Sequence, residues 1–477
     1  MPLGKDGGVR NAEVSTLSAI PLSQFRYAHC QLPLGRGAFR LCVNQLDKLQ
    51  FICFLISFCI YKLKIMCYNQ NDKILLKEIS KMVRGNIKLD NPARFAGKYE
   101  IPAEKIQATI KKATDKWLKK LDEFGGLFPG ACSKEDKYVL GENNTWTQGM
   151  HTGATILAYE LTGNERFLEH AKQQIKTYFT RFETKTGLWD HDVGFVYTPS
   201  VIALYRLTGD ESLKELAIKA ANHLYDNMYS QKGGFIQRSF DASSEPGCRT
   251  MMDTLMNIPL FFWTYEQTGE QKFLDAAKSQ LAITESCLIR EDGSSFHHYQ
   301  FEVETHKPVR GLTFQGHSDD SCWSRGHSWG VYGFPVAYTY TKDESLLPLH
   351  RDVCYFVLNH LPEDNIPYYD YDFVEKCDEA RDSSAALVNA CGMLEACKYL
   401  PDTAEEKEYY RNAAMMMIEG VIDNCMDYDN KDFDGLINWV TCSAPHNLCI
   451  DGCTSYGDFF LLEALKRITD PDWKRYW

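Results

Sequence analysis

Residues 154–173 read ATILAYELTGNERFLEHAKQ, and the same pattern returns at residues 201–220 as VIALYRLTGDESLKELAIKA and at residues 260–279 as LFFWTYEQTGEQKFLDAAKS. Looser copies lie at residues 334–353 and 391–414, and a last one, FFLLEALKRITDPDWKRYW, closes the chain. Each copy has an apolar stretch, a short break, and a more polar stretch whose apolar residues recur at helical spacing. The pattern predicts a series of helical hairpins.

The short breaks between the apolar and polar stretches contain residues that are typical of helix ends. A Gly such as Gly163 suits a left-handed residue after a helix C-terminus, and the Asn, Asp or Glu that follows it can cap the next helix. Six hairpins, counting the last, indicate closure into a ring. We therefore predict an all-α fold, an (α/α)6 toroid with apolar inner and amphipathic outer helices. Alternating residues at 233–240 and 294–305 predict short strand hairpins at its rim.

Composition narrows the class of protein. The chain has 477 residues, 44% of them hydrophobic, and a net charge of −12. An acidic balance argues against a nucleic-acid partner, which would need a basic surface. The 17 cysteines are scattered singly without a CxxC pair, which favours free thiols in a reducing compartment over a disulfide framework. We expect a cytoplasmic protein.

Residues 1–65 differ from the rest of the chain. They carry eight basic groups against three acids and end in an apolar run at residues 51–61, which is too short to span a bilayer as a helix. Three interpretations stay open: sequence upstream of a natural start at Met66, a membrane-proximal or secretory leader, and a folded extension. We expect residues 1–65 to lie outside the working protein and residues 66–477 to form one catalytic domain without a membrane anchor.

Two acids are embedded in apolar stretches. Asp253 lies in TMMDTLMNIPLFFWTY and Asp192 in LWDHDVGFVYTPSVIALY, each at the start of a predicted inner helix. A carboxylate in such surroundings is costly unless it is paired or protonated, and a neighbouring acid raises its pKa toward neutrality. The alternative is that both residues are helix caps. Asp190 and Asp241 are weaker candidates on the same pattern.

Polar residues are dense in GLTFQGHSDDSCWSRGHSWGVYGFP at residues 311–335. Arg325 and Trp329 are four residues apart and would share a helix face, which suits a sugar ring that bears a carboxylate. The alternative for Arg325 is a structural ion pair with Asp319 or Asp320. Trp146, in ENNTWTQGM, precedes another inner helix and is either a ligand platform or a core residue.

These motifs together resemble the unsaturated glucuronyl hydrolases of glycoside hydrolase family 88. The resemblance rests on NTWTQGM, HDVGF, MMDTLMNIP, FQGHSDDSCWSRGHSWGVYG and SYGDFFLLEAL, in order over roughly residues 75–477. It implies an (α/α)6 barrel without a metal or cofactor. The implied substrate is an oligosaccharide left by a polysaccharide lyase, with a Δ4,5-unsaturated uronic acid at its non-reducing end.

The resemblance also implies residue roles. Asp253 matches the general acid/base and Asp192 the second essential acid. Five further residues match positions that line the subsite of the unsaturated sugar: Trp146, His297, Gln315, Arg325 and Trp329. The family often has an aromatic residue near residues 238–240, and the presence of Arg238 and Phe240 here leaves that match open. We hypothesise that protonated Asp253 donates a proton to C4, that Asp192 holds Asp253 protonated, and that Arg325 supplies the local cation for an anionic sugar.

Three other functions stay open. The runner-up is an unsaturated rhamnogalacturonyl hydrolase acting on pectin fragments. An ordinary inverting glycosidase would place two carboxylates across the glycosidic oxygen, and a noncatalytic toroid would bind glycans without turnover. The preferred partner sugar, its sulfation and a possible homo-oligomer are not readable from the sequence.

Overall fold

The computed structural model describes residues 84–239, 247–426 and 433–477. The chain divides into two units, Met1–Cys67 and Tyr68–Trp477, and the described residues all belong to the second unit. The predictions made for residues 1–65, for Phe240 and for Asp241 lie outside the described residues. Among the described helices, none combines the length and apolar character needed to cross a membrane.

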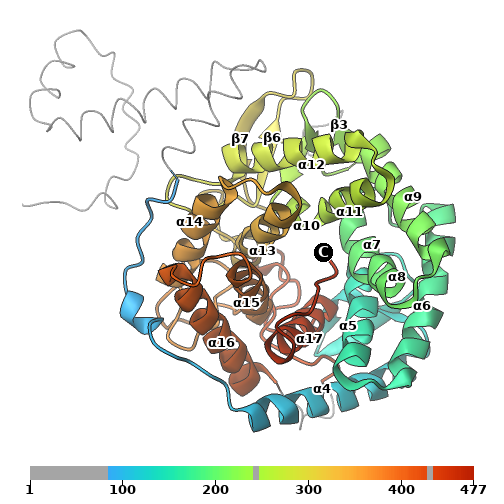
Figure 1. Cartoon of the computed structure of the whole chain (residues 1–477), viewed down its shortest axis with the longest axis horizontal. Helices are drawn as coiled ribbons and strands as arrows, with labels where there is room; N and C mark the ends of the chain where they lie inside the picture. The colour runs from blue at the N-terminus through green and yellow to red at the C-terminus, as the bar shows by residue number, and fades with distance from the viewer. Residues whose placement is uncertain (1–83, 240–246, 427–432) are drawn as a thin grey trace, which may run out of the picture. The chain divides into compact units, whose positions relative to one another are not determined.

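Helical hairpins form two concentric rings, which confirms the predicted (α/α)6 toroid (Figure 1). In the described ranges, the inner ring has six positions, two of them built from consecutive helical segments: α5 (Thr147–Thr162), α7 with α8 (Val193–Tyr197 and Ala203–Thr208), α10 with α11 (Thr254–Asn257 and Pro259–Thr268), α13 (Ser324–Thr341), α15 (Ser383–Cys397) and α17 (Ser455–Thr469). The outer ring contains α4 (Ala103–Phe124), α6 (Glu165–Thr184), α9 (Glu211–Met228), α12 (Gln271–Ile283), α14 (Leu346–Asn359) and α16 (Glu405–Cys425).

The hairpin turns have the predicted chemistry. Gly163 and Gly209 end their helices with φ of 68° and 67°, in the left-handed region that glycine adopts without strain. The next residues cap the outer helices, because Asn164 accepts from the Arg166 N–H and Asp210 from the Ser212 N–H. Local sequence therefore sets where each inner helix ends and each outer helix begins.

The ring closes differently from the prediction that the last repeat forms its own hairpin. Helix α17 packs against α5 and α4, so its outer neighbour is α4, from the beginning of the described chain. Pro471 follows α17 and no helix forms after it in the described residues. The chain end is instead anchored by buried aromatic rings, and Trp477 contacts the rings of Phe195, Tyr332 and Phe459.

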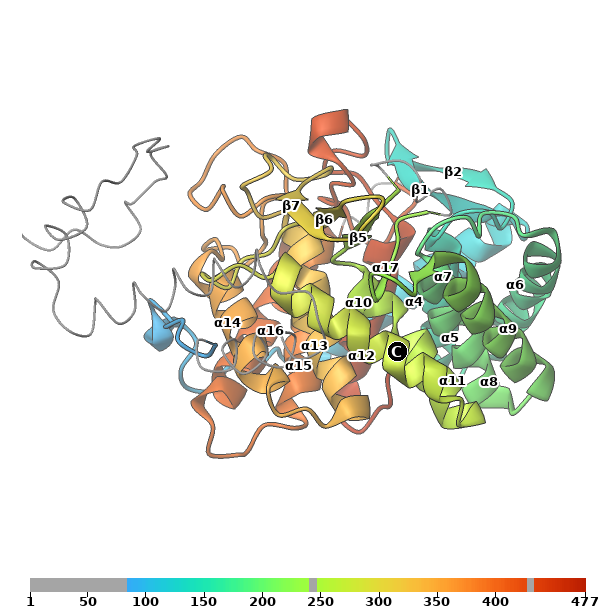
Figure 2. The ribbon, with the colours of Figure 1, turned by 90° about the horizontal axis from the view of Figure 1, so that it is seen from above.

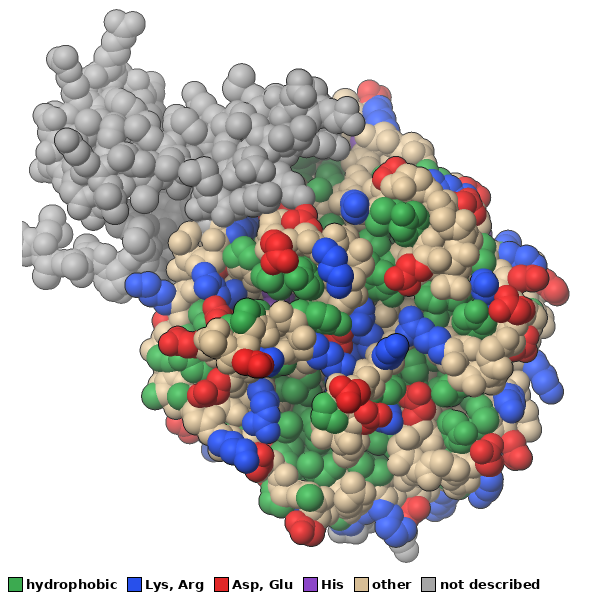
Figure 3. All heavy atoms as spheres, in the orientation of Figure 1, with side chains coloured by type: hydrophobic (Ala, Val, Ile, Leu, Met, Phe, Trp, Pro, Cys, Tyr) green, Lys and Arg blue, Asp and Glu red, His purple; other side chains and the backbone are tan. Residues whose placement is uncertain are grey.

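The two ends of the barrel differ. The C-terminus lies at the end that holds the hairpin turns, where Figure 3 shows Lys and Arg side chains near the middle of the face. The strands lie at the opposite end (Figure 2). They form the hairpins β1–β2 (Phe128–Lys134 and Lys137–Gly141) and β3–β4 (Tyr229–Ser230 and Phe235–Ile236), and the antiparallel sheet β5–β6–β7 (Arg249–Met251, His298–Phe301 and Pro308–Leu312).

The predicted rim strands are confirmed at residues 235–236 and 298–301, whereas β1–β2 was not predicted. A buried ion cluster joins the C-terminal turns of α15 and α17 and the segment that follows α17. Its members are buried side chains joined by N–H to carboxylate bonds of 2.7–2.9 Å: Arg467, Arg475, Glu395 and Glu463.

Candidate active site

Asp192 and Asp253 each stand directly before an inner helix, α7 and α10, at the end of the barrel that carries the strands. Both occupy the N-cap position, but neither side chain accepts a capping hydrogen bond. The helix-cap alternative therefore does not hold. The side chains are only 12% and 15% exposed, so both carboxyl groups need another partner.

That partner is His191, which is 2% exposed. Its Nε2 lies 3.4 Å from a carboxylate oxygen of Asp192 and 3.5 Å from one of Asp253. Burial alone would lower the pKa of His191, but the two carboxylates outweigh burial and raise that pKa to about 9. An imidazolium ion therefore stands between the two acids at neutral pH.

Asn257 fixes the relative position of the acids. Its Nδ2 donates to Asp192 Oδ1 over 3.4 Å and to the backbone carbonyl of Asp253 over 3.1 Å, and its Oδ1 accepts from the Phe195 N–H over 2.9 Å. Helices α7 and α10 approach closely here, since a Cβ on Gly194 would lie 2.4 Å from the Asn257 Cα. The backbone of both helices thus positions the pair.

The two acids have different proton affinities. Burial raises the pKa of Asp192 to about 7, with Asp190 and Asp253 adding to the effect and His191 opposing it. Burial would also raise the pKa of Asp253, but His191 and His297 outweigh it and the net direction is downward. In the free protein the proton of the pair therefore lies on Asp192, whereas the hypothesis drawn from the sequence places it on Asp253.

Arg325 is buried and already paired. Its Nη1 forms an ion pair with Asp382, rather than with Asp319 or Asp320. The same Nη1 donates to the backbone carbonyl of Thr441 over 2.7 Å. Its Nη2 donates to the backbone carbonyl of Cys442 over 2.8 Å. The prediction that Arg325 adds a net positive charge is corrected, because the buried carboxylate of Asp382 neutralises it. The guanidinium is held rigidly, with one hydrogen left over on Nη2.

Aromatic rings surround this guanidinium. Arg325 lies 4.7 Å from the ring centre of Trp323 and 4.9 Å from that of Tyr456. Trp146, which is half-buried, stacks on Tyr456 with ring centres 5.2 Å apart and planes 20° apart. Tyr456, Trp323 and Arg325 are buried, so of the three rings only Trp146 offers an accessible face on which a sugar ring can pack.

Trp329 lies deeper than predicted. It is 2% exposed and packs against Phe195 at 5.2 Å and Phe460 at 5.7 Å between ring centres. Because Phe195 also contacts Trp146 at 5.4 Å, Trp329 supports the aromatic group from below. The aromatic rings beside Arg325 are therefore those of Trp323 and Tyr456, and not the ring of Trp329, which was predicted to share a helix face with Arg325.

His297 and Gln315 lie between the acids and the aromatic group. The Phe314 N–H donates to His297 Nδ1 over 3.1 Å, so the proton of this neutral imidazole lies on Nε2. Burial lowers the pKa of His297 to about 3, and its ring lies 4.5 Å from the ring of Trp323. Gln315 donates to the backbone carbonyl of Cys442 over 2.7 Å.

Several buried polar atoms here have no hydrogen-bond partner in the described chain. They include Asp253 Oδ1, His297 Nε2, Trp323 Nε1 and both ring nitrogens of His191, whose contacts with the two acids are 3.4 and 3.5 Å long. Leaving such atoms unpaired costs about 1–3 kcal/mol each. A polar ligand that supplies both hydrogen-bond donors and acceptors, as a sugar does, would satisfy these atoms.

The structure places Arg238 beside Asp190 and Trp189. Arg238 Nη1 lies 3.3 Å from a carboxylate oxygen of Asp190, and its guanidinium lies 5.5 Å from the ring centre of Trp189, which is exposed. Asp190 accepts from the Asp192 N–H over 3.1 Å. Asp190 thus holds the backbone of Asp192, and the exposed ring of Trp189 lies beside Arg238.

Sequence reasoning missed four residues of this arrangement. His191 precedes Asp192 in HDVGF, and Asn257 follows Asp253 by four residues, a spacing that puts both on one helix face. Those two signals were available. Trp323 was noted only as part of a dense stretch. Asp382 has no local signal, because it pairs with Arg325 across 57 residues of chain.

One group of side chains has the composition of a metal site. Asp190, His191 and Asp192 place one ligand atom each within 4.8 Å of one another. A histidine must be neutral to bind a metal ion, and the carboxylates raise the pKa of His191 to about 9. A metal ion bound here would have to displace the proton of His191.

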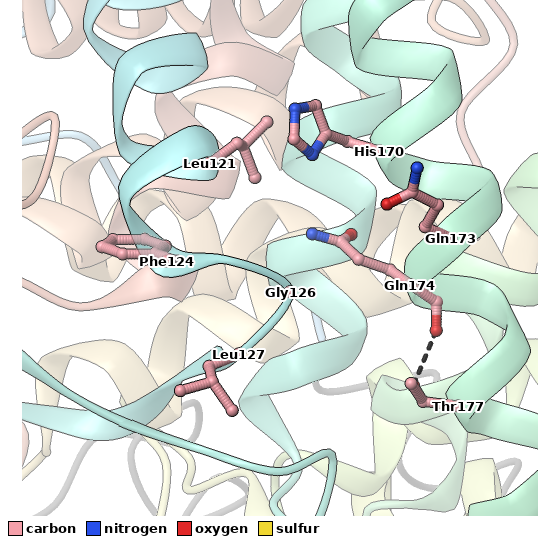
Figure 4. A pocket seen from close by; sticks show the side chains of 8 residues that line it. All are labelled: Leu121, Phe124, Gly126, Leu127, His170, Gln173, Gln174 and Thr177. Atoms are coloured by element: carbon pink, nitrogen blue, oxygen red, sulfur yellow. Dashed lines mark hydrogen bonds between the residues drawn. The ribbon is translucent and has the colours of Figure 1, made fainter.

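A hollow of about 230 Å³ lies elsewhere, between α4 and α6 (Figure 4). Its lining includes Leu121, Phe124 and Leu127, with His170 and Gln174 at its edge. It contains no carboxyl group.

An (α/α)6 barrel with two buried carboxyl groups beside an aromatic and guanidinium platform defines a glycoside hydrolase. Residues 109–363 match Glycosyl Hydrolase Family 88, and the chain belongs to this family. It is 37% identical over 398 residues to an unsaturated chondroitin disaccharide hydrolase of Streptococcus pneumoniae, covering 82% of this chain and 98% of the relative. An unsaturated glucuronyl hydrolase of Bacillus sp. GL1 is 32% identical over 76% of this chain and 96% of the relative.

Solved structures agree with this assignment. The crystal structure of an unsaturated glucuronyl hydrolase from Streptococcus agalactiae superposes with a TM-score of 0.78 at 35% identity, over 82% of this chain and 98% of the other. A substituted form of that enzyme, solved with dGlcA-GalNAc6S, superposes with a TM-score of 0.73 at 32% identity, over 82% and 99%.

Proposed function

We propose that the chain releases Δ4,5-unsaturated glucuronic acid from the non-reducing end of glycosaminoglycan disaccharides produced by lyases. The observation that carries the proposal is the pair Asp192 and Asp253 bridged by His191, which stores a proton beside unsatisfied polar atoms. The relatives support the substrate class, since one is named for chondroitin disaccharides and a solved structure contains dGlcA-GalNAc6S. No observation favours pectin fragments.

The reaction is a hydration of the C4=C5 vinyl ether. A carboxylic acid of the pair donates its proton to C4, which gives C5 oxocarbenium character. The carboxylate that results removes a proton from a water molecule, and the water oxygen adds to C5. The product is a hemiketal, which opens and expels the partner sugar. The acid is regenerated, and no bond to C1 needs direct displacement.

The position of His191 supplies a route for the proton. Its Nε2 contacts both carboxyl groups, so it can give its proton to Asp253 and take one from Asp192. We assign Asp253 as the group that faces the sugar, because its Oδ1 is the unsatisfied carboxylate oxygen. Asp192 is then the reservoir that keeps Asp253 supplied. This refines the hypothesis that Asp192 holds Asp253 protonated.

Recognition of the sugar carboxylate falls to Arg325 and its neighbours. The remaining Nη2 hydrogen of Arg325 can donate to that carboxylate, with Gln315 and His297 Nε2 as neutral donors. Asp382 pairs with Arg325, and Asp190 pairs with Arg238. Arg249 is a further cation, whose charge acts on Asp253 and His297.

The test follows the absorbance of the unsaturated bond during incubation with purified protein. Chondroitin-, hyaluronan- and heparin-derived unsaturated disaccharides form the panel, and a pectin-derived unsaturated disaccharide is the comparison. We expect absorbance to fall with at least one glycosaminoglycan product and to persist with the pectin product. Loss of absorbance with the pectin product alone would overturn the proposal. The free thiols of the described cysteines support a cytoplasmic setting for this reaction.

A further inference from the structure

The carboxylate of Asp370 joins two distant parts of the chain beside the candidate active site. Asp370 lies between α14 and α15 and is 0% exposed. Its Oδ2 accepts from the His317 N–H over 2.8 Å and from the Ser321 hydroxyl over 2.6 Å, and its Oδ1 accepts from the Cys322 N–H over 3.2 Å. One buried carboxylate therefore holds both ends of residues 317–322.

The donors around this carboxylate belong to the backbone and to one hydroxyl. Its Oδ1 also accepts from the Asp372 N–H over 3.1 Å, so its hydrogen-bond partners in the described chain are three backbone N–H groups and the Ser321 hydroxyl. The two backbones pair as well, since the Tyr371 N–H donates to the Cys322 carbonyl over 2.9 Å. Hydrogen bonds to an ionised acceptor are roughly twice as strong as those between neutral groups. The loop is therefore fixed at this point.

The fixed loop carries groups that the proposed function assigns to sugar recognition. Gln315 stands two residues before His317, and its Nε2 donates to the Cys442 carbonyl over 2.7 Å. The Phe314 N–H donates to His297 Nδ1 over 3.1 Å, which leaves the proton of the neutral His297 on Nε2. The conformation of the loop thus sets the position of Gln315 and the tautomer of His297.

Gly316 shows how closely the carboxylate approaches the loop. A Cβ on Gly316 would lie 2.8 Å from Asp370 Oδ2 and 2.7 Å from Thr313 Oγ1. The Gly316 N–H donates to the same Thr313 hydroxyl over 2.8 Å. The carboxylate therefore packs against the backbone directly after Gln315, and a displacement of one moves the other.

We propose that Asp370 is a positioning residue, which presets the loop of residues 313–322 so that Gln315 and His297 can bind the carboxylate of the unsaturated sugar. The proposal rests on the proposed function, because that function assigns these two residues to sugar recognition. Asp370 acts through the loop, since its side chain is buried and its oxygens are occupied by loop donors. The acid pair stands before α7 and α10, so loss of Asp370 weakens substrate binding and spares the proton transfer.

The experiment measures kcat, KM and the pH–kcat profile on an unsaturated chondroitin disaccharide, together with amide hydrogen exchange over residues 313–323. Asp370→Asn places an amide where the loop presents N–H groups. Gly316→Ala keeps the carboxylate and displaces it from the side of the loop, and it decides the question if Asp370→Asn does not fold. Asp370→Asn is also made in a Gln315→Ala background.

Asp352→Asn is the matched control, because it neutralises another buried carboxylate that holds backbone N–H groups. Asp352 is 2% exposed on the outer helix α14 and accepts from the N–H groups of Gly85 and Ile87 over 2.7 and 3.2 Å. Calorimetry supplies a readout that needs no turnover: it measures the affinity of the disaccharide for Asp253→Asn with and without Asp370→Asn.

We expect Asp370→Asn to raise KM about tenfold, with kcat and the pH–kcat profile nearly unchanged and with faster exchange over residues 313–323. Gly316→Ala should change KM and exchange in the same direction. A merely structural defect would lower the active fraction, which reduces kcat at an unchanged KM. In the Gln315→Ala background Asp370→Asn should raise KM less than in the wild type, because part of its effect passes through Gln315. Asp352→Asn should lower the unfolding temperature and leave KM in place.

An unchanged KM in folded Asp370→Asn, or an equal rise of KM in Asp352→Asn, overturns the positioning role while the proposed hydrolysis stands. If Asp370→Asn does not fold, an unchanged KM in Gly316→Ala overturns it. If the wild type hydrolyses no unsaturated disaccharide, the proposed function fails and calorimetry decides the role of Asp370. About tenfold weaker affinity then supports positioning, and equal affinity overturns it.

Discussion

Replacing His191 by Asn removes the imidazolium that stands between the two acids and keeps a polar side chain of similar size. In the wild type, the carboxylates raise the pKa of His191 from 6.5 to about 9. At about 1.4 kcal/mol per pKa unit, this corresponds to a net interaction of about 3 kcal/mol. Burial opposes this shift, so the coupling itself is larger, and by reciprocity the imidazolium lowers the carboxyl pKa values by at least roughly one unit for each acid.

The direction in which the carboxyl pKa values move follows from the positive charge that the substitution removes. Loss of a positive charge raises both carboxyl pKa values, so H191N must move both limbs of the pH–kcat profile to higher pH by about one unit. On the proposed function, wild-type activity should fall as pH rises through about 7, the raised pKa of Asp192. In H191N that fall occurs at about pH 8, because the carboxyl pKa has risen.

The imidazolium also contributes to the stability of the fold. The pKa of His191 in the folded protein lies above its ordinary value of 6.5. Its contribution is therefore complete below about pH 6.5 and is lost as pH rises through about 9. H191N should lose up to about 3 kcal/mol of unfolding free energy at mildly acidic pH and much less at high pH.

The assay measures kcat and KM for an unsaturated disaccharide across the pH range by loss of absorbance. His170→Asn is the matched control, because His170 lies on α6 and pairs with Asp122, away from the site. A pH–kcat profile that stays in place for H191N, or a change confined to KM, would refute the reasoning about the proton.

Other predictions concern separate parts of the molecule. Arg467→Met leaves the carboxylates of the buried ion cluster without their central cation, and denaturant unfolding should show a loss of about 3–5 kcal/mol. Gly149→Ala places a Cβ 2.1 Å from the Phe195 carbonyl oxygen, where α5 meets α7; we expect thermal unfolding to reveal about 1–3 kcal/mol of destabilisation from overpacking. Trp146→Ala removes an aromatic platform, which should raise KM roughly tenfold, the equivalent of about 1.4 kcal/mol, while kcat changes little.

The ring of helical hairpins could be predicted from the sequence, because the residues that define each hairpin turn are neighbours along the chain. Gly163 and Asn164 show why, since a left-handed glycine and a capping side chain define one hairpin turn without help from distant residues. The closure by α4 was not predictable in this way. It depends on packing between the two ends of the described unit, and the aromatic residues after Pro471 gave no periodic signal.

The same distinction between local and long-range information applies to the residues of the candidate site. Asp192 and Asp253 stand out because an acid in an apolar stretch needs a reason, and the structure brings both to one histidine. The partner of Arg325 could not be found, because Asp382 lies 57 residues away and acts through the tertiary fold. The burial of Trp329 could not be found either, since helical spacing gives a face but not a depth.

The central claim is that Asp253 delivers the proton that starts hydration of the double bond. Its most direct test is the turnover of folded Asp253→Asn on an unsaturated glycosaminoglycan disaccharide, measured by loss of absorbance at saturating substrate. The account predicts that kcat falls by about 10²–10⁴-fold, the usual contribution of general acid–base catalysis, while the fold is retained. Near-full turnover by Asp253→Asn would contradict it.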